Sequence, residues 1–559
     1  MTDPQSTKAT VADVIIGRLG ALGVDRIFGV HGANIEDLYA AALAGSDVEP
    51  VVAKHEFSAG TMADGAARIT GKPAAVMTTS GGGAMNVVAA LAESFDSRVP
   101  VLALIGSAPT VLEGHGGFQD MLSPPDTIDA MAIFSAVTGL CLKIDAPQQI
   151  HAALNSAEEV LAANLPVALI IPKDVQSSLV VDRPRLRCVP DRTVAPIAEL
   201  EEVAATLSDA RGAVTVLAGE EASRQQLGDD LADLVTATEG VLAATPGGRD
   251  VLDSGVPTVG LTGVMGHPSA AAAVAKSAVL LVLGSRLSLT DRAGLDTGDT
   301  IVIHLGAEVP TIDVDTHVQI TDLRWAVQVI TKNIDTAGTR TRRVTPGIEA
   351  LPTPARVSPG ESGLLTSIQV IQTIGDRIPL GSNIFADAGN VGAAAIHHLP
   401  VDRGGRFVVA LGMGGMGYAF GAAIGAAMVT GHRSVVLAGD GAFLMHGMEI
   451  HTAIEHRLPL TVVLFNNNAH GMCVTREQLY FPDTPSINRF RPTDFEAGLS
   501  AMFPSLTVSG ARSRTELLAC GDAAFDGGGP QCLVVQTDPD ELPPFAPFLA
   551  ARTTLEEHR

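Results

Sequence analysis

Two polar turns, GDG at 439–441 and NNN at 466–468, contain the residue types in this sequence that could do chemistry together. Each turn follows an apolar run typical of a buried strand, SVVLA before the first and LTVVLF before the second. The pattern GMEIHTAIEH predicts an amphipathic helix over 447–456, ending ahead of Pro459. A strand–helix–strand unit of this length makes its two strands parallel. Both turns should therefore lie at the same edge of a sheet, where ligands of open α/β sheets bind.

The side chains of these turns could hold a divalent cation and a diphosphate. Asp440 offers a carboxylate and Asn467 an amide oxygen, and such hard oxygen ligands suit Mg²⁺ or Ca²⁺. Gly439, Gly441 and Ala442 leave the backbone bare enough for a diphosphate to approach beside a helix N-terminus. Either turn alone is a common structural feature, and the combination at consecutive strand ends favours a site.

The stretch from GDG to NNN resembles the thiamine diphosphate motif of the acetolactate synthase and pyruvate decarboxylase superfamily. The resemblance covers nearly the whole chain, and it is most specific in the first and last thirds. It implies that Asp440, Asn467 and the backbone oxygen of Ala469 ligate Mg²⁺ (or Ca²⁺), and that this ion bridges to the diphosphate of the cofactor.

Other parts of the same cofactor site can be matched in the last third of the chain. The segment ALGMGGMGYAFGAAIGAA resembles the family's GxGxMGxxxxAAIGA segment. The resemblance implies that the Gly414 carbonyl accepts from the cofactor's 4′-amino group, and that Met416 supports the bent cofactor between its two rings. ADAGNVGAA lies where the family places another diphosphate loop, which makes Asn390 and Gly392 candidate contacts. From the residues alone, a glycine-rich loop with one flexible thioether suits a planar ring, and a helix-packing glycine run is the alternative.

The first third of the chain contributes a glutamate and a glycine loop. Glu56 lies between a strand end and a helix start, where it could simply complement the helix dipole. The resemblance implies instead that Glu56 bonds N1′ of the aminopyrimidine and favours the tautomer that takes the proton from thiazolium C2. TSGGGAMN resembles the family's TSGPGATN loop, with Gly82 in place of the proline. Because Glu56 and Asp440 lie in different domains, the family pattern implies an active site between subunits of a homodimer or homotetramer.

Two segments of the first third bear on the substrate. GVHGANIEDLY resembles the benzaldehyde lyase segment that supplies an active-site histidine, here His31, although a histidine near a strand end is often structural. GHGGFQD resembles the FQE segment of acetolactate synthases and 2-hydroxyacyl-CoA lyases, which implies that Phe118 and Gln119 reach the active site. Gln119 could donate to a developing alkoxide. The His-His pair of pyruvate decarboxylases is absent here, which argues against release of a free aldehyde as the main outcome.

A further substrate candidate follows the asparagines. HGMCVTREQLYF resembles the family's QGMVxQWQxLFF, and Arg476 falls where acetolactate synthases carry a tryptophan important for the acceptor. Its guanidinium could bind a carboxylate or phosphate, and an exposed helical arginine is the alternative. His470 replaces the family's usual polar residue after the metal loop, with its role left open.

Alternating β-branched runs and alanine-rich patterns predict the elements that position these residues. They predict an α/β fold of three Rossmann-like parallel-sheet domains at 1–182, 195–335 and 363–545, separated by two proline-rich polar linkers. By the resemblance these are the pyrimidine-binding, central and diphosphate-binding domains. The first and third share a rhythm of strand, glycine-rich turn and helix, which is weak evidence of duplication. The expected strands are DRIFGV, EPVVA, AAVMTTS, VPVLALIG and VALIIP, then AVTVLAG, AVLLVLG and DTIVIHL, then NIFADAG, RFVVALG, SVVLAGDG, LTVVLFNN and QCLVVQT.

The composition excludes several classes of protein. A net charge of −24 on 559 residues argues against nucleic-acid binding, although a metal ion could still reverse the sign inside a cleft. The five cysteines form no C-x-x-C pair, which argues against a disulfide framework or structural zinc. The longest apolar stretch, AAAAVAKSAVLLVLG, contains Lys276 and is too short for a membrane span. With no secretory pattern at the N-terminus, we expect a cytoplasmic protein without membrane partners.

FAD is a doubtful cofactor on sequence grounds. VLGSRLSLTDRAG only faintly resembles the GARFDDRVTG segment that helps to hold FAD in acetolactate synthases. The family's IHIDIDP is replaced by IHLGAEVP, which argues for a vestigial nucleotide fold.

The resemblance implies a carboligase dependent on thiamine diphosphate and Mg²⁺. It would decarboxylate a 2-oxo acid, pyruvate by default, and couple the resulting acyl carbanion to a second carbonyl, as acetolactate synthases do. The alternative is a non-decarboxylating C–C lyase or ligase of the benzaldehyde lyase or 2-hydroxyacyl-CoA lyase type. A catalytically silent binding subunit would be expected to lack Glu56 or the metal ligands, and both are present.

Overall fold

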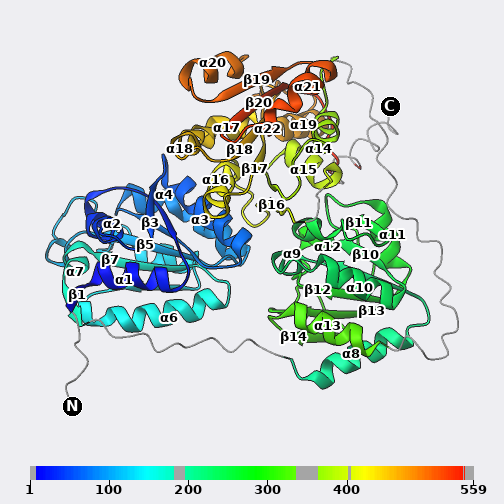
Figure 1. Ribbon diagram of the computed structural model, residues 1–559, viewed down its shortest axis with the longest axis horizontal. Helices are drawn as coiled ribbons and strands as arrows, with labels where there is room; N and C mark the ends of the chain where they lie inside the picture. The colour runs from blue at the N-terminus through cyan, green and yellow to red at the C-terminus, as the bar shows by residue number, and fades with distance from the viewer. Residues whose placement is uncertain are drawn as a thin grey trace.

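The structure is a computed structural model that describes residues 8–181, 195–334, 363–400 and 404–545, together with residues 547 and 550. The described chain forms three lobes, each built on a six-stranded parallel sheet (Figure 1). We call them the N-terminal, central and C-terminal domains. The α/β class with three parallel-sheet domains is therefore confirmed. Both proline-rich linkers lie largely outside the described residues, so the linkers and the expected domain boundaries stay predictions.

The N-terminal domain surrounds its sheet with helices on both faces. From edge to edge the strands are β3 (Glu49–Val52), β2 (Arg26–Val30), β4 (Ala74–Thr78), β5 (Val101–Ser107), β7 (Val167–Pro172) and β6 (Leu140–Lys143). The helices are α1 (Val11–Ala21), α2 (Glu36–Leu43), α3 (Glu56–Thr70), α4 (Gly82–Asp96), α5 (Ala130–Ala136), α6 (Ile150–Ala162) and α7 (Lys173–Gln176). β1 (Lys8–Thr10) and β8 (Leu179–Val181) form a separate antiparallel pair beside it.

The C-terminal domain repeats the strand order of the N-terminal domain. Its sheet runs β16 (Phe407–Val409), β15 (Asn383–Ala386), β17 (Ser434–Gly439), β18 (Leu460–Asn466), β20 (Gln531–Gln536) and β19 (Thr507–Ala511). Its helices are α14 (Ser367–Gly375), α15 (Asn390–His398), α16 (Tyr418–Thr430), α17 (Asp440–His446), α18 (Ile450–Glu455), α19 (Gly471–Tyr480), α20 (Phe495–Met502), α21 (Arg514–Gly521) and α22 (Ala523–Asp526). In both sheets the order along the chain is second, first, third, fourth, sixth, fifth, which supports the weak sign of duplication in the sequence.

The central domain has a different topology. Its strands run β11 (Thr258–Leu261), β10 (Val241–Ala244), β9 (Ala213–Ala218), β12 (Ser277–Leu283), β13 (Ile301–Gly306) and β14 (Thr316–Gln319), the 3-2-1-4-5-6 order of dinucleotide-binding folds. Its helices are α8 (Ile197–Asp209), α9 (Glu220–Arg224), α10 (Gly228–Thr238), α11 (Pro268–Ala275), α12 (Leu289–Arg292) and α13 (Leu323–Asn333).

Helices α3 and α16 pack against each other and join the two outer domains near the centre of the molecule (Figure 1). Both are rich in glycine and alanine and are buried on nearly all sides, as expected of a helix enclosed between two domains. A Cβ on Gly65 would lie 2.2 Å from the Ala422 carbonyl oxygen, and one on Gly425 would lie 2.0 Å from that of Met62. The close approach of the two backbones therefore requires glycine at these positions.

Two expectations about elements need correction. The helix expected over 447–456 begins earlier, because α17 starts at Asp440 and a 3₁₀ turn over Gly447–Glu449 leads into α18. At Gly447, where the 3₁₀ turn begins, a Cβ would lie 2.3 Å from the Phe443 ring.

The second correction concerns strands that the sequence did not predict. Within the three large sheets these are β6, β10, β11, β14 and β19, and all except β10 are sheet edges. Edge strands are partly exposed, so they do not need the continuous apolar runs of the fully buried central strands β5 and β18.

Among the described residues, every helix is too short or too polar to traverse a lipid bilayer. The apolar stretch around Lys276 is divided between helix α11 and strand β12.

Candidate active site

The two polar turns meet at the carboxyl ends of neighbouring strands, as the sequence predicts. Gly439 at the end of β17 pairs with Phe465 near the end of β18, so Asp440 and Asn467 follow side by side. A cleft opens there, and its wall includes Asn390, Met416 and Asp440. All lining residues found in the described part of the chain belong to the C-terminal domain.

Asp440 presents an unpaired oxygen to this cleft. The residue is 1% exposed, and its Oδ1 accepts a hydrogen bond from the Gly441 N–H at 2.9 Å. Its Oδ2 is buried and has no hydrogen-bond partner within the described residues. Burial raises the pKa of Asp440 to about 6, against the opposing effect of backbone hydrogen bonds from Gly441, Asn468 and Ala469. A buried carboxylate oxygen without a partner is costly, and a cation beside Oδ2 would remove that cost.

The three asparagines of the second turn differ in what they contact: two stabilise the turn and one lines the cleft. Asn466 Nδ2 donates to the Thr493 carbonyl, and Asn468, with φ at 52°, accepts from the Thr493 N–H through its side chain. Only Asn467 of the three lines the cleft, and its Oδ1 accepts from the Ala469 N–H at 3.0 Å. The outer two therefore hold the turn that presents Asn467 and Ala469.

The diphosphate-loop candidates do not all face the cleft. Asn390 begins α15 and lines the cleft, with a buried Oδ1 that lacks a partner among the described residues. Gly392 lies within α15 and instead packs against the turn that follows β15, since a Cβ there would lie 2.3 Å from the Asp387 carbonyl oxygen. Gly439, Gly441 and Ala442 all line the cleft.

The glycine loop before α16 reaches the same cleft through its methionine. Met416 lies on the wall, and its Cε would be 3.4 Å from a Cβ on Gly441. Gly414 is exposed and has φ at 64°, a left-handed conformation that favours glycine, and no atom would lie within 4 Å of a Cβ there.

A second group of polar side chains lies at the carboxyl ends of the N-terminal sheet. Glu56 opens α3 and is 9% exposed, and its Oε2 accepts from Asn86 Nδ2 of α4 at 2.9 Å. Its Oε1 faces Gly83, where a Cβ would lie 3.1 Å away. Gly82 begins α4 beside this contact but has open space around it.

Gln119 and His31 lie near the same edge. Gln119 has φ at 62°, packs on Gly81, and accepts through Oε1 from Ser80 Oγ at 3.3 Å. The His31 ring lies 4.8 Å from that of Tyr39. Burial and then the charge of Glu56 raise the pKa of Tyr39 well above its usual value.

Three substrate candidates are placed outside or at the rim of these groups. Phe118 is 86% exposed, which leaves it free to contact another molecule. Arg476 on α19 is exposed, and its guanidinium lies 5.6 Å from the Tyr480 ring centroid. His470 lines the cleft, and its buried Nδ1 would lie 2.5 Å from a Cβ on Gly441.

The sequence did not single out several residues that shape these groups. Asn86 holds Glu56, and Ser80 holds Gln119. Both lie in the segment TSGGGAMN, so the motif itself was a usable signal. Asp387 accepts from the Gly417 and Ala419 N–H groups at the start of α16, and its burial raises its pKa to about 6.

In the central domain, the edge of the sheet at which this topology usually binds nucleotides is closed. A Cβ on Gly219, after β9, would lie 2.3 Å from the Gly284 carbonyl oxygen after β12, so these two turns touch. Glu220 and Glu221 open α9 at the same place, where a diphosphate would meet two carboxylates. This arrangement gives no support for FAD binding.

Comparison with known proteins agrees with this architecture. Three family models match the chain: the N-terminal thiamine pyrophosphate (TPP) binding domain over residues 9–132, the central domain over 200–327 and the C-terminal TPP binding domain over 387–535. The chain therefore belongs to the thiamine pyrophosphate enzymes, and the expected family and enzyme class are confirmed. Thiamine diphosphate is thus the cofactor of its family.

The sequence identity to individual relatives is low. The chain is 25% identical to the acetolactate synthase isozyme 2 large subunit of Escherichia coli, over 94% of this chain and 95% of that protein. It is 28% identical to the acetolactate synthase of Mycobacterium leprae, over 87% of this chain and 79% of that protein. A solved structure from Mycobacterium smegmatis, provisionally described as thiamin diphosphate-dependent, superposes with a TM-score of 0.80 at 22% identity, over 95% of this chain and 100% of that one.

The residues of the C-terminal cleft fit a metal-bound diphosphate. Asp440 Oδ2 and Asn390 Oδ1 are buried and lack partners within the described ranges, and the small residues of the GDG turn leave the backbone accessible. In the same ranges, no three or more His, Cys, Asp or Glu side chains form a metal cluster. One carboxylate, one amide and one backbone oxygen instead match Mg²⁺, which takes its remaining ligands from water and phosphate.

Proposed function

We propose that this protein is a carboligase dependent on thiamine diphosphate and Mg²⁺ that decarboxylates a 2-oxo acid, with pyruvate as the default donor. The acyl unit is then joined to a second carbonyl compound, as in the acetolactate synthases it resembles. The observation that carries the proposal is the unpaired, buried Asp440 oxygen in a cleft whose wall also carries Asn467 and Met416. When bound, thiamine diphosphate supplies the nucleophilic carbon that makes and breaks bonds beside a carbonyl.

The chain's own residues would have separate tasks in this reaction. Asp440, Asn467 and the Ala469 carbonyl would hold Mg²⁺, and Asn390 would contact the diphosphate. Glu56, buried and oriented by Asn86, would hold and move the proton at the aminopyrimidine.

Substrate handling would fall to the N-terminal group and to α19. The Gln119 amide would donate to an alkoxide oxygen of the substrate. Arg476 would bind a carboxylate on the acceptor, since a guanidinium pairs with a carboxylate in two parallel hydrogen bonds.

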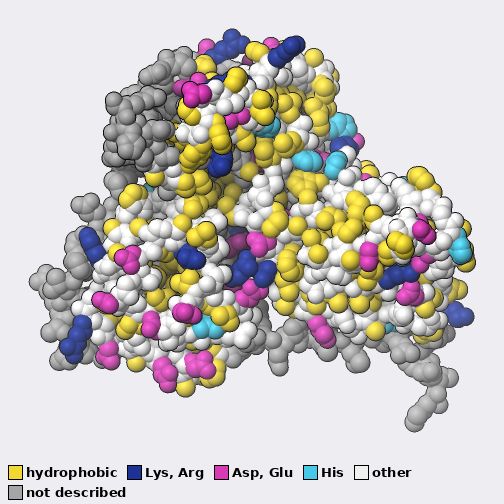
Figure 2. Space-filling view, turned by 180° about the vertical axis from the view of Figure 1, so that it is seen from behind, with side chains coloured by type: hydrophobic (Ala, Val, Ile, Leu, Met, Phe, Trp, Pro, Cys, Tyr) yellow, Lys and Arg dark blue, Asp and Glu magenta, His cyan; other side chains and the backbone are white. Residues whose placement is uncertain are grey.

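We further propose that the working unit is a homodimer or a tetramer with each site between subunits. The cleft is lined from the C-terminal domain, whereas Glu56 and Gln119 belong to the N-terminal domain. Apolar side chains next to the cleft remain uncovered: Met413, Leu444, Met445 and Met448 are 45–57% exposed. Figure 2 shows hydrophobic side chains gathered between the upper C-terminal lobe and the N-terminal lobe at the right. A second copy of the chain would cover such a face and bring a glutamate to each cleft.

A C–C lyase of the benzaldehyde lyase or 2-hydroxyacyl-CoA lyase type is the second candidate. The His31 ring contacts that of Tyr39 at an interplanar angle of 47°, and the pKa of Tyr39 rises partly through the charge of Glu56. This contact favours the lyase, because it places an imidazole near the proposed proton carrier.

The test is incubation of the purified protein with thiamine diphosphate, Mg²⁺ and carbon-labelled pyruvate, with and without a panel of 2-oxo acid and aldehyde acceptors. We expect labelled CO₂ and a coupled acyloin or 2-hydroxy-3-oxo acid, and neither when Mg²⁺ is omitted. Release of aldehyde from benzoin or from a 2-hydroxyacyl thioester, with pyruvate untouched, would support the lyase instead. No reaction with any donor would overturn both candidates.

A further inference from the structure

A glutamate of the N-terminal domain holds the cofactor loop of the C-terminal domain. Glu93 lies on α4 and is 3% exposed. Its two oxygens accept from backbone N–H groups of the glycine loop, Oε2 from Met413 at 2.6 Å and Oε1 from Gly412 at 3.3 Å. These amides directly precede Gly414, the candidate contact for the aminopyrimidine.

The other end of the same loop is held from within the C-terminal domain. Asp387 accepts from the N–H groups of Gly417 at 2.9 Å and Ala419 at 3.0 Å. Met416 and Gly414 thus lie in a short span between two carboxylate-bound ends. A glycine-rich span has many accessible conformations, so its position depends on what holds its ends.

The reverse contact runs from the C-terminal to the N-terminal domain. Glu449, in the 3₁₀ turn before α18, is 2% exposed, and both its oxygens accept from the Lys54 N–H at 3.1 Å. Thr452 Oγ donates to it at 2.6 Å. Lys54 precedes Glu56 by two residues, so this contact fixes the chain just ahead of the proposed proton carrier.

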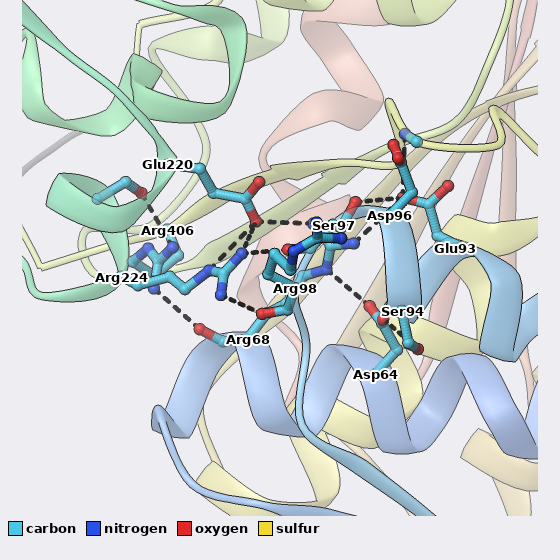
Figure 3. A network of polar contacts seen from close by, with 12 residues as sticks. Asp64, Arg68, Glu93, Ser94, Asp96, Ser97, Arg98, Glu220, Arg224 and Arg406 are labelled. Carbon is cyan, nitrogen blue, oxygen red and sulfur yellow. Dashed lines mark hydrogen bonds and ion pairs between the residues drawn. The ribbon is translucent and has the colours of Figure 1, made fainter. Parts of the chain in front are cut away.

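The carboxylate of Glu93 is itself fixed by an ion-pair network that reaches all three domains (Figure 3). Arg68 donates to Glu93, to Asp64 on its own helix and to Glu220 of the central domain, at 3.2, 2.7 and 2.9 Å. Ser97 Oγ also donates to Glu93 at 2.7 Å. The charge of Glu93 is therefore compensated, and its carboxylate has a single orientation toward the loop.

The same network holds the strand that leads into the loop. Arg406, directly ahead of β16, donates to the Arg68 carbonyl at 3.0 Å and to Asp250 of the central domain at 2.7 Å. Figure 3 shows Arg406 and Arg224 on the central-domain side of Arg68, and Glu93 on the opposite side. Strand β16, which leads into the glycine loop, and the Glu93 carboxylate, which binds that loop, are therefore held by the same ion-pair network.

We propose that Glu93 and Glu449 are reciprocal positioning residues of the reaction: each outer domain uses a buried glutamate to hold the backbone of the loop that carries the other domain's cofactor-contacting residue. This inference rests on the proposed function for what the loops contact. Glu93 positions the backbone of Gly414 and Met416, so its loss should lower the affinity for the cofactor. Glu449 positions the chain that carries Glu56, so its loss should lower the turnover rate.

The test uses the full chain with Glu93→Gln and Glu449→Gln, which keep the side-chain shape but turn one acceptor oxygen into a donor. Matched controls are Glu308→Gln, which removes the partially exposed ion pair with Arg98, and Glu455→Gln, which removes the exposed ion pair with Lys54 Nζ. Where glutamine prevents folding, Glu93→Asp or Glu449→Asp shortens the reach and frees the same amides.

The first readout is amide hydrogen exchange in the cofactor-free protein. We expect Glu93→Gln to accelerate exchange at Gly412 and Met413 by about tenfold or more, the factor of one charge-assisted hydrogen bond, and to leave Lys54 unchanged. Glu449→Gln should accelerate Lys54 alone. Unchanged exchange at these amides overturns the proposal.

The second readout separates positioning from general stability. Glu93→Gln should weaken the affinity for thiamine diphosphate, measured with Mg²⁺ by titration calorimetry, with a smaller change in kcat. Glu449→Gln should lower kcat with affinity nearly retained, and both controls should match the wild type. Equal losses of both parameters in both variants, in step with the thermal midpoint, would mean a merely structural role. If the wild type shows no turnover, the proposed function fails, while exchange and cofactor affinity still decide this inference.

Discussion

The N-terminal and C-terminal domains share one strand order but carry different chemistry at the same edge of the sheet. The N-terminal edge presents a carboxylate and two amides that form side-chain hydrogen bonds, Glu56, Asn86 and Gln119. The C-terminal edge presents small residues, an unpaired carboxylate oxygen and amide oxygens around a cleft. The shared topology therefore puts polar groups at the same edge of both sheets, whereas the turn residues give each edge its own set of groups.

The central domain supplies the contrast. Its 3-2-1-4-5-6 sheet would offer a nucleotide crevice, yet the turns after β9 and β12 touch and Glu220 there binds Arg68 of the N-terminal domain. The edge that binds ligands in related topologies is here used to join domains.

The largest effect should come from removing the proposed proton carrier. Glu56→Gln keeps the shape and the contact with Asn86, so the cofactor should still bind, while kcat falls by about 10² to 10⁴, the usual contribution of a general acid–base. Turnover of the best 2-oxo acid and a cofactor titration measure the two parameters. The control is Glu49→Gln, an exposed partner of Arg26. If cofactor binding fell as much as turnover, the division of labour between the outer domains would be wrong.

The corresponding change in the C-terminal domain should act on binding. Asp440→Asn removes the charge of the proposed metal ligand, and its effect should be at least about 100-fold on Mg²⁺-dependent cofactor affinity, because even residues that only support a ligand cost 10- to 100-fold. Calorimetric titration at fixed Mg²⁺ is the measurement. Asp483→Asn, in an exposed turn, serves as the control. Unchanged affinity would remove Asp440 from the metal site.

The contact between the outer domains should be sensitive to a single methyl group. Gly65→Ala places a Cβ 2.2 Å from the Ala422 carbonyl oxygen, so the helices must separate, at a cost of about 1–3 kcal/mol in unfolding free energy. Gly17→Ala is a matched control on α1, exposed and with no atom within 4 Å of the new Cβ. Because alanine favours helices, that variant should be neutral or more stable by up to about 1 kcal/mol. Denaturant unfolding with equal losses in both variants would contradict the close crossing.

The smallest effect concerns the joint between the central and C-terminal domains. His267 Nδ1 accepts from the Leu261 N–H and Nε2 donates to the His397 carbonyl, so the buried ring is held neutral. Burial, and then the neighbouring His397 and Arg249, lower the pKa of His267 to about 3. In the unfolded chain a histidine protonates near pH 6.5. The stabilisation is therefore full above about pH 6.5 and is lost as the pH falls toward 3.

His267→Asn should remove this pH dependence while its Oδ1 still accepts from Leu261. Between pH 7 and 5 the variant should lose about 1–2 kcal/mol less unfolding free energy than the wild type. Thermal midpoints across this range, with exposed His432→Asn as control, measure the difference. Parallel curves for all three proteins would show that His267 titrates equally in both states.

The amino-acid sequence was enough to predict the short segments that carry the candidate site residues. The turns at Asp440 and Asn467, the methionine loop and the start of α3 each lie within one short segment, and strand periodicity places each at a strand end. Their motifs could be found because chemistry and position depend on neighbours along the chain. Four edge strands (β6, β11, β14 and β19) and the start of α17 at Asp440 had no comparable signal, since partial exposure and glycine-rich backbone weaken the apolar pattern.

The contacts that hold these segments together could be found only in the folded structure. Met413 meets Glu93 across 320 positions of the chain, and Lys54 meets Glu449 across 395. It also showed that Asn390 faces the cleft while Gly392 packs on Asp387. A backbone amide has no side-chain identity, and a contact made to it leaves no periodic mark in either segment, so such contacts emerge only when the domains pack.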